Sequence, residues 1–315
     1  MVDIRNLLME QAQRYIGEER DKPLIVSVMG QTGVGKSSLI NALFGTSLKT
    51  DPVRPCTKVV ERVTVRGSDG SVMWFNDMPG IGESERADQQ YLEEYRKKLT
   101  DSDAVIWAIH ADTRSVTADL ATLSRLIRTK QGAEQAARLF NKITFVLTKT
   151  DLAAVAPWGY GKADGHGYFA PGPVNRPVLD DKAEYFRQAL LDPFRDLMYA
   201  STHHEGPFTI KDERFTVGQG LIGYRGSLDQ QTLQTLERRH PDYAQVLDRL
   251  HAVHQVVPCS ARFRFNLAKL LVTVVAKATG TATLRLEKFI NISGMHHVTP
   301  REMEKMRNII PLDLK

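Results

Sequence analysis

Residues 30–37 read GQTGVGKS, which matches the pattern G-x-x-x-x-G-K-[ST] at every fixed position. The run follows the apolar residues 24–29, which predict a buried strand, and it opens a predicted helix from Lys36 to Phe44. Glycines in such a turn let backbone N–H groups point inward around phosphate oxygens, and the helix N-terminus adds its dipole. The sequence therefore predicts a phosphate-binding loop between a strand and a helix.

The positions of this loop have distinct expected roles. Lys36 supplies a positive charge between the β- and γ-phosphates and takes part in catalysis, and the Ser37 hydroxyl is a ligand for Mg²⁺. The nucleotide-binding residues predicted here are Gly30, Gln31, Thr32, Gly33, Val34, Gly35, Lys36, Ser37 and Ser38.

Two further signals predict the metal and γ-phosphate contacts. Asp77-Met78-Pro79-Gly80 ends a predicted strand, so that Asp77 can hold the Mg²⁺ shell and the Gly80 N–H can reach the γ-phosphate. Thr57 stands in a loop twenty residues after Ser37 and twenty before Asp77. A threonine there can close over Mg²⁺ and release when the γ-phosphate leaves, which is an order–disorder switch. We expect Ser37, Thr57 and Asp77 as metal ligands.

The base is expected to be guanine. Thr148-Lys149-Thr150-Asp151 follows an apolar strand over residues 143–147. A carboxylate at Asp151 can accept hydrogen bonds from N1–H and the 2-amino group of guanine, which adenine lacks, while the Lys149 stem lies over the purine. Ser260 and Ala261 follow a predicted strand over 253–257, and their backbone can meet the guanine O6.

Apolar strands that alternate with helices predict the fold class. We expect an α/β P-loop NTPase (Rossmann-like) three-layer sandwich with a mostly parallel sheet. Two strands joined by the tight turn 67–70 predict one antiparallel pair at the edge. The other expected elements are strands 58–65, 72–77 and 104–110, helices 86–99 and 266–278, and one or two helices within 116–140.

The chain divides into three predicted parts. Residues 1–22 contain an amphipathic helix, 23–280 form the nucleotide-binding domain with an insert at about 152–252, and 281–315 form a partly helical tail. Within the insert we expect a loop over Pro157–Pro177 and a helix interrupted by proline at about 180–200. A hairpin at about 208–217 and a second helix interrupted by Pro241 are expected to follow.

These motifs together carry a family resemblance. The run GQTGVGKSSLINALFG, with DMPGIGES, YLEEYRKKL and DAVIWAIHAD, resembles translation-factor-class GTPases of the Era-like branch, in particular bacterial YfjP/YeeP-type GTPases. The resemblance covers about residues 23–151 and 253–279. It implies GTP and GDP as ligands, Mg²⁺ as cofactor, and hydrolysis coupled to a partner. It leaves the insert and the tail unexplained.

The catalytic machinery is incomplete in the sequence. Ile81 stands where many regulatory GTPases carry a glutamine that orients water, so hydrolysis is expected to be slow. Gly33 replaces the asparagine that marks K⁺-dependent relatives. Arg54, three residues before Thr57, is a candidate arginine finger, with a solvated loop arginine as the alternative. Glu83 and Arg86 are weaker candidates.

Composition leaves the setting open. The net charge is +5, which permits contact with RNA or anionic lipid and proves neither. Cys56 and Cys259 are expected as reduced thiols in a cytoplasmic protein. No charge-free apolar run approaches the length of a transmembrane segment. The pairs His203-His204 and His296-His297 lack companion ligands for a metal and are expected to be exposed.

Several alternatives remain beside the slow GTPase switch. The chain can be a nucleotide-dependent scaffold whose insert or tail binds a protein, with Trp158, Tyr160, Tyr168 and Phe169 as the contact or as self-packed residues. It can be a membrane-surface GTPase that uses helix 3–20. A homodimer across the nucleotide face is a further alternative. RNA or ribosome binding is implied only by the resemblance.

Overall fold

Six strands form the central sheet of the protein, in the spatial order β11-β5-β4-β1-β3-β2. The computed structural model describes residues 22–44, 46–48, 60–66, 72–80, 85–128, 132–154, 157–163, 166–218 and 220–277. The strands are β1 (Leu24–Gly30), β2 (Glu61–Arg66), β3 (Val72–Asp77), β4 (Ala104–His110), β5 (Ile143–Thr148) and β11 (Val257–Pro258). Only β2 pairs antiparallel within this sheet, with β3. The mostly parallel sheet and its antiparallel edge pair are therefore confirmed.

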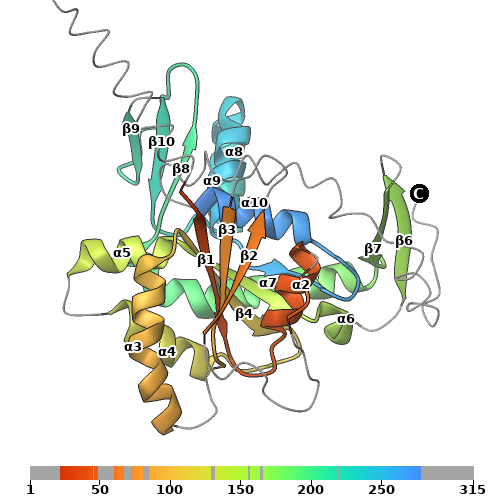
Figure 1. Cartoon of the computed structure of the whole chain (residues 1–315). Coiled ribbons are helices and arrows are strands. Elements are labelled where there is room, and N and C mark those ends of the chain that lie inside the picture. Colours follow the sequence, from red (N-terminus) through yellow and green to blue (C-terminus); the bar gives the residue numbers. More distant parts are fainter. Residues whose placement is uncertain are drawn as a thin grey trace, which may run out of the picture.

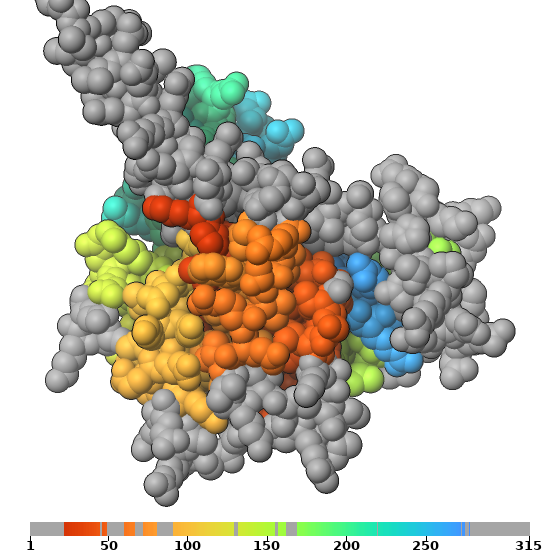
Figure 2. Space-filling view, in the orientation of Figure 1, coloured from red at the N-terminus to blue at the C-terminus, as the bar shows by residue number. Residues whose placement is uncertain are grey.

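Helices cover both faces of this sheet. They are α2 (Lys36–Phe44), α3 (Glu85–Asp101), α4 (Thr117–Ile127), α5 (Ala133–Asn141) and α10 (Leu267–Lys277). The helices α3, α4 and α5 share one buried cluster with β4 and β5, while α2 and α10 share a second one on the opposite face (Figure 1). Figure 2 shows β2 and β3 at the surface between α3 and α2. The three-layer α/β architecture is confirmed.

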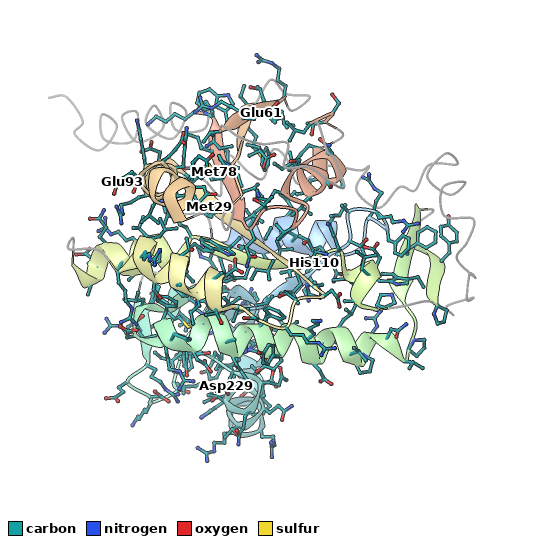
Figure 3. The ribbon with its side chains drawn as sticks, turned by 90° about the horizontal axis from the view of Figure 1, so that it is seen from below. Met29, Glu61, Met78, Glu93, His110 and Asp229 are labelled. Atoms are coloured by element: carbon teal, nitrogen blue, oxygen red, sulfur yellow. The ribbon has the colours of Figure 1, made fainter. Side chains whose placement is uncertain are left out.

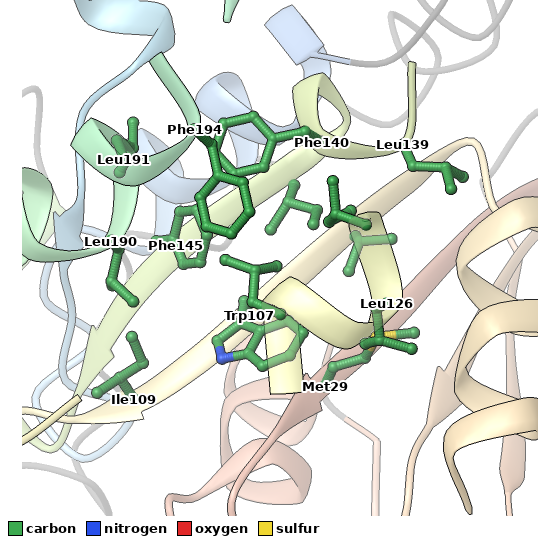
Figure 4. Close-up of a cluster of buried hydrophobic side chains, with 14 of the residues drawn as sticks. Met29, Trp107, Ile109, Leu126, Leu139, Phe140, Phe145, Leu190, Leu191 and Phe194 are labelled. Atoms are coloured by element: carbon green, nitrogen blue, oxygen red, sulfur yellow. The ribbon is translucent and has the colours of Figure 1, made fainter. Parts of the chain in front are cut away.

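Aromatic side chains fill the first of the two clusters (Figure 4). Trp107 of β4 and Phe145 of β5 are fully buried, and Phe140 of α5 stacks on Phe194 with ring centroids 4.9 Å apart. Strand β4 is buried along both faces, as a central parallel strand must be when helices cover the sheet. This packing fixes the positions of β4 and β5. It therefore also positions the residues at their carboxyl ends, His110 and Thr148.

The chain between β5 and β11 forms several small elements. They are α6 (Thr150–Ala153), β6 (Trp158–Ala163), β7 (His166–Pro171), α7 (Asn175–Leu191), η1 (Asp192–Leu197), β8 (Tyr199–His203), β9 (Phe215–Gly218), β10 (Leu221–Arg225), α8 (Gln230–Arg239), η2 (Pro241–Tyr243) and α9 (Ala244–Val253). Strands β6 and β7 form a hairpin, and β8-β10-β9 form an antiparallel sheet backed by α8 and α9. The helix interrupted at Pro241 is confirmed by α8, η2 and α9.

The expected loop over Pro157–Pro177 is wrong. The segment forms the hairpin β6–β7, whose buried Trp158 and Phe169 face an apolar cluster and so stabilise the strands. Pro177 lies in the first turn of α7, where the missing N–H of proline costs no helical hydrogen bond. The aromatic residues Trp158 and Phe169 are therefore self-packed.

Three other boundaries from the sequence are also wrong. The helix expected to reach Ala200 ends at Leu191, because Pro193 begins a 3₁₀ turn and Ala200 lies in β8. The hairpin expected at 208–217 is instead β9 and β10, which turn at Gly220 with φ +75°. Val253 ends α9 rather than starting a strand, because it is buried on the apolar face of that helix.

The two ends of the chain lie outside the described residues. The predicted N-terminal helix and the predicted tail, 281–315, therefore stay predictions. Among the described helices, none combines the length and the apolar character that crossing a bilayer requires.

Candidate nucleotide-binding site

The turn from β1 into α2 depends on glycines. Gly30 has φ +138°, and a Cβ added there would lie 2.1 Å from the carbonyl oxygen of Ala108 on β4. Gly33 and Gly35 have φ +77° and +96°, which L-residues with side chains rarely adopt. Glycine at these positions therefore allows the tight turn and the close approach to β4.

Lys36 lies inside this loop. Its ammonium group donates hydrogen bonds to the carbonyl oxygens of Gly30, at 3.2 Å, and Gln31, at 3.1 Å. The side chain is only 6% exposed. A positive charge held at the centre of a glycine turn, at a helix N-terminus, creates a site for an anion of high charge.

Ser37 and Asp77 meet across the sheet edge. The Ser37 hydroxyl donates a 2.6 Å hydrogen bond to Asp77 Oδ2. Asp77 ends β3 and is fully buried, and the backbone N–H of Met78 continues the β1–β3 ladder by donating to Val28 at 3.2 Å. Hydroxyl and carboxylate oxygens are the ligands that Mg²⁺ prefers, so this pair fits the expected metal.

The segment after Asp77 packs against the loop. A Cβ added at Gly80 would lie 1.9 Å from the Thr32 hydroxyl and 2.4 Å from the Thr32 Cα. The Tyr95 hydroxyl of α3 donates to the carbonyl of Pro79. Met29 and Met78 lie in the same buried cluster as Tyr95, and Figure 3 places both near α3. Movement of Gly80 would thus change the contact with Thr32 of the loop and, through Pro79, the contact with Tyr95 of α3.

Residues at the end of β5 contact the other side of the loop. The Thr148 hydroxyl lies 2.5 Å from the carbonyl oxygen of Val34, and Lys149 Nζ donates to the carbonyl of Gly33 at 2.7 Å. The Lys149 Cε lies 3.4 Å from the Cβ position of Gly35. Lys149 has φ +55°, which is uncommon for a residue other than glycine. In this conformation its side chain reaches the loop.

Asp151 and Ser260 are brought together although they are far apart in sequence. The Ser260 hydroxyl donates a 2.6 Å hydrogen bond to Asp151 Oδ1. The strand β11 anchors this contact, because the N–H of Cys259 donates to Leu147 at 2.7 Å and the N–H of Thr150 donates to Cys259 at 3.2 Å. Ala261 follows Ser260 and is half-buried.

His110 ends β4 at the same edge of the sheet (Figure 3). Burial, followed by the nearby positive charge of Lys149, lowers the pKa of His110 below its ordinary value. Its Nδ1 accepts a 3.1 Å hydrogen bond from the N–H of Asp112, which requires the unprotonated nitrogen. The imidazole is therefore neutral near pH 7.

Asp119 on α4 is a functional neighbour that sequence reasoning missed. Its carboxylate accepts hydrogen bonds from the Gln31 side chain, at 2.6 Å, and from the Trp107 indole, at 2.8 Å. Burial raises the pKa of Asp119, and the two hydrogen bonds act in the opposite direction. An acidic residue four positions before Leu123 on an apolar helical face was the available signal.

Some predicted site residues fall outside this description. Arg54, Thr57, Ile81, Glu83, Cys56 and the His296-His297 pair lie outside the described residues. Arg86 lies in α3 without a described side chain, and Ser38 is half-buried on α2. In the described part of the chain, no group of three or more His, Cys, Asp and Glu residues could hold a metal ion, and His203 is exposed while His204 is half-buried. Cys259 is a free thiol whose pKa is raised by burial.

The fold and this edge define a class of protein. A glycine loop from β1 into α2, with Asp77 at the end of β3 and Asp151 shortly after β5, is the arrangement of P-loop nucleotide-binding domains. Residues 25–149 match the family described as 50S ribosome-binding GTPase.

Curated relatives agree with this class. The chain is 32% identical over 154 residues to the uncharacterized protein YkfA of Escherichia coli, which covers 49% of this chain and 50% of YkfA. It is 37% identical over 130 residues to YfjP of E. coli, with 41% and 42% covered. It is 23% identical over 216 residues to GTPase Era of Geotalea uraniireducens, with 61% and 71% covered.

Residues 25–149 thus match a GTPase family model, and this part of the chain is similar to YkfA and YfjP and, at lower identity, to GTPase Era. The chain spans about half the length of the first two relatives.

Proposed function

We propose that this protein binds guanine nucleotides and hydrolyses GTP to GDP and phosphate at a low intrinsic rate, as a conformational switch. One observation carries the proposal. The loop 30–37 contacts candidate site residues on two sides. Ser37 donates a hydrogen bond to Asp77, the other proposed metal ligand, and Gly33 accepts one from Lys149, which stands two residues before the proposed base-reading residue Asp151. A nucleotide that spans the loop meets phosphate, metal and base contacts together.

Mg²⁺ is the cofactor that the proposal requires. Ser37 and Asp77 would hold it, with Thr57 as the third protein ligand. Bound there, Mg²⁺ would neutralise negative charge on the phosphates. In this proposal Lys36 binds and orients the phosphates, and the Gly80 N–H donates to the γ-phosphate. Because Gly80 is packed on Thr32, loss of that contact would release the segment that follows it.

The low rate follows from the residue after Gly80. Ile81 has no group that can orient water. Arg54 is a candidate for charge stabilisation in cis, and a second copy of the chain across the nucleotide face is a candidate in trans. In single-turnover assays, Arg54→Ala would slow phosphate release in the first case. In the second case, the rate would rise with protein concentration instead.

Calorimetry of GDP against ADP, both with Mg²⁺, tests the nucleotide assignment. The proposal expects tight GDP binding and weak ADP binding, because Asp151 finds both of its donors only on guanine. Equal affinities, or no binding, would mean that the guanine assignment is wrong. Phosphate release from GTP, compared with the variant Lys36→Ala, then tests hydrolysis.

The proposal also includes a biological role for the switch. The matched family is described as ribosome-binding, so we propose a ribosome or its RNA as one partner that the GTP-bound form recognises. We propose the cytoplasm as its compartment. If the protein is a scaffold, it should bind another protein in a nucleotide-dependent way. If it acts at a membrane surface, it should bind vesicles in a nucleotide-dependent way. Co-sedimentation with ribosomes, with GDP and with a slowly hydrolysed GTP analogue, separates these outputs.

A further inference from the structure

The turn from Ser260 to Phe265 connects the base-reading residue to an aromatic cluster. Ser260 and Phe265 exchange backbone hydrogen bonds of 3.2 and 3.0 Å, which close the turn. Inside it, the N–H of Phe263 donates to the Ser260 hydroxyl oxygen at 3.1 Å. The same hydroxyl donates to Asp151. The orientation of Ser260 therefore depends on the position of Phe263.

Phe263 is held by the hairpin β6–β7. It is 4% exposed, and its ring centroid lies 4.9 Å from that of Trp158 on β6 and 5.6 Å from that of Phe169 on β7. Phe265 packs edge-on against Trp158, with centroids 5.3 Å apart. Aromatic contacts of this kind add energy beyond the burial of area, and they fix ring positions.

The same cluster reaches Asp151 by a second route. The Trp158 indole donates a 2.8 Å hydrogen bond to the carbonyl of Ala154, the residue that caps the C-terminus of α6. Helix α6 contains Asp151. Trp158 is thus linked indirectly to both partners of the Ser260–Asp151 contact, to Ser260 through Phe263 and to Asp151 through α6.

The phosphate loop depends on different packing. Val34 belongs to the buried cluster beneath α2 and α10, and no hairpin residue with a described side chain lies in that cluster. Loosening the hairpin would therefore act most directly on Ser260 and Asp151, whereas the phosphate loop keeps its own packing beneath α2.

We propose that the β6–β7 hairpin positions the base-reading site, with Phe263 and Trp158 as positioning residues that set selectivity for guanine. The inference rests on the proposed function. Its physical reason is that Asp151 must be held to within about 0.5 Å to pair with two donors on one base edge. Of the two donors, the 2-amino group can be tested by itself, because inosine differs from guanosine by that group alone.

The test measures the dissociation constants of GDP and IDP, with Mg²⁺, for wild type, Phe263→Ala and Phe263→Leu. We expect the ratio of the IDP constant to the GDP constant to fall about tenfold in Phe263→Ala, chiefly through weaker GDP binding. Phe263→Leu keeps much of the apolar volume, so its ratio should lie between those of wild type and Phe263→Ala. Trp158→Phe, which keeps the ring contact and loses the indole donor, should also lower the ratio.

Phe215→Ala is the matched control, because Phe215 is a buried aromatic residue of the separate cluster on α8 and α9. It should lower thermal stability and leave the ratio unchanged. An unchanged ratio in folded Phe263→Leu and Trp158→Phe would overturn the inference while the proposed function stands. A wild-type ratio near one would instead overturn the guanine assignment, and this inference with it.

Discussion

The Ser37 hydroxyl donates a hydrogen bond of 2.6 Å to the Asp77 carboxylate, which joins the first turn of α2 to the end of β3. Both groups are acceptable ligands for one hard cation, and both sit beside the loop that is built for phosphates. The two candidate metal ligands thus lie within hydrogen-bond distance of each other.

Removal of the metal provides the first prediction. EDTA should weaken GDP binding by wild type about tenfold or more, whereas Asp77→Asn should bind GDP weakly and respond little to EDTA. Calorimetry with and without Mg²⁺ checks this. Asp181→Asn, an exposed carboxylate on α7, should behave like wild type. An Asp77→Asn variant that keeps the full Mg²⁺ effect would remove Asp77 from the metal site.

Gly80→Ala should separate the two nucleotide states. Its Cβ would clash with the backbone of Thr32, so residues 78–80 must move away from the loop. Binding of a slowly hydrolysed GTP analogue should weaken about tenfold while GDP binding changes little. Gly218→Ala meets nothing within 4 Å and serves as the control. Equal losses for both nucleotides would show that Gly80 does not sense the γ-phosphate.

Asp119→Ala should destabilise the fold. The change leaves the buried Trp107 indole without its acceptor and removes the contact with Gln31, at a cost of about 1–3 kcal/mol. Urea unfolding measures the free energy. Glu134→Ala, which breaks an exposed ion pair with Arg138, should change it by less than about 1 kcal/mol. If the two variants were equally stable, Asp119 would have no anchoring role.

Lys142 should make stability rise with pH. Its ammonium donates to the carbonyls of Thr100 and Ser102, and burial lowers the pKa of Lys142 to about 8. Between about pH 8 and the ordinary lysine pKa of about 10.4, the unfolded chain holds a proton that the folded chain has released. The free energy of unfolding therefore increases with pH across this window.

The contribution of Lys142 is at most about 1.4 kcal/mol per pH unit. Lys142→Gln keeps a hydrogen-bond donor and lacks the titrating group, so its unfolding free energy should rise less between pH 8 and 10. Identical slopes for wild type and Lys142→Gln, measured by urea unfolding, would show that Lys142 titrates normally.

The sequence predicted the parts of the site that are continuous along the chain. Residues 30–37 carry their own turn and helix start, and Asp77 and Asp151 each follow an apolar strand. Parallel strands place their carboxyl ends at one edge, so these signals could be assembled without coordinates.

The parts that depend on contacts between distant segments could not be predicted. The glycines and prolines of the hairpin at Trp158 suit turns and so favour a loop, whereas aromatic partners distant in sequence, Phe263 and Phe265, pack on it and stabilise its strands. Asp119 is similar, since its partners Gln31 and Trp107 come from two other elements. Val253 was assigned to a strand because β-branched residues suit strands as well as the buried side of a helix.

The central claim is that Asp151 reads guanine, and binding of GDP and xanthosine diphosphate to wild type and Asp151→Asn tests it most directly. Asn keeps an oxygen for the Ser260 hydroxyl and replaces the other with an amide that donates, which suits the 2-carbonyl of xanthine. We predict that wild type prefers GDP and that Asp151→Asn prefers xanthosine diphosphate. A variant that keeps the wild-type preference, or loses both nucleotides equally, would contradict the account.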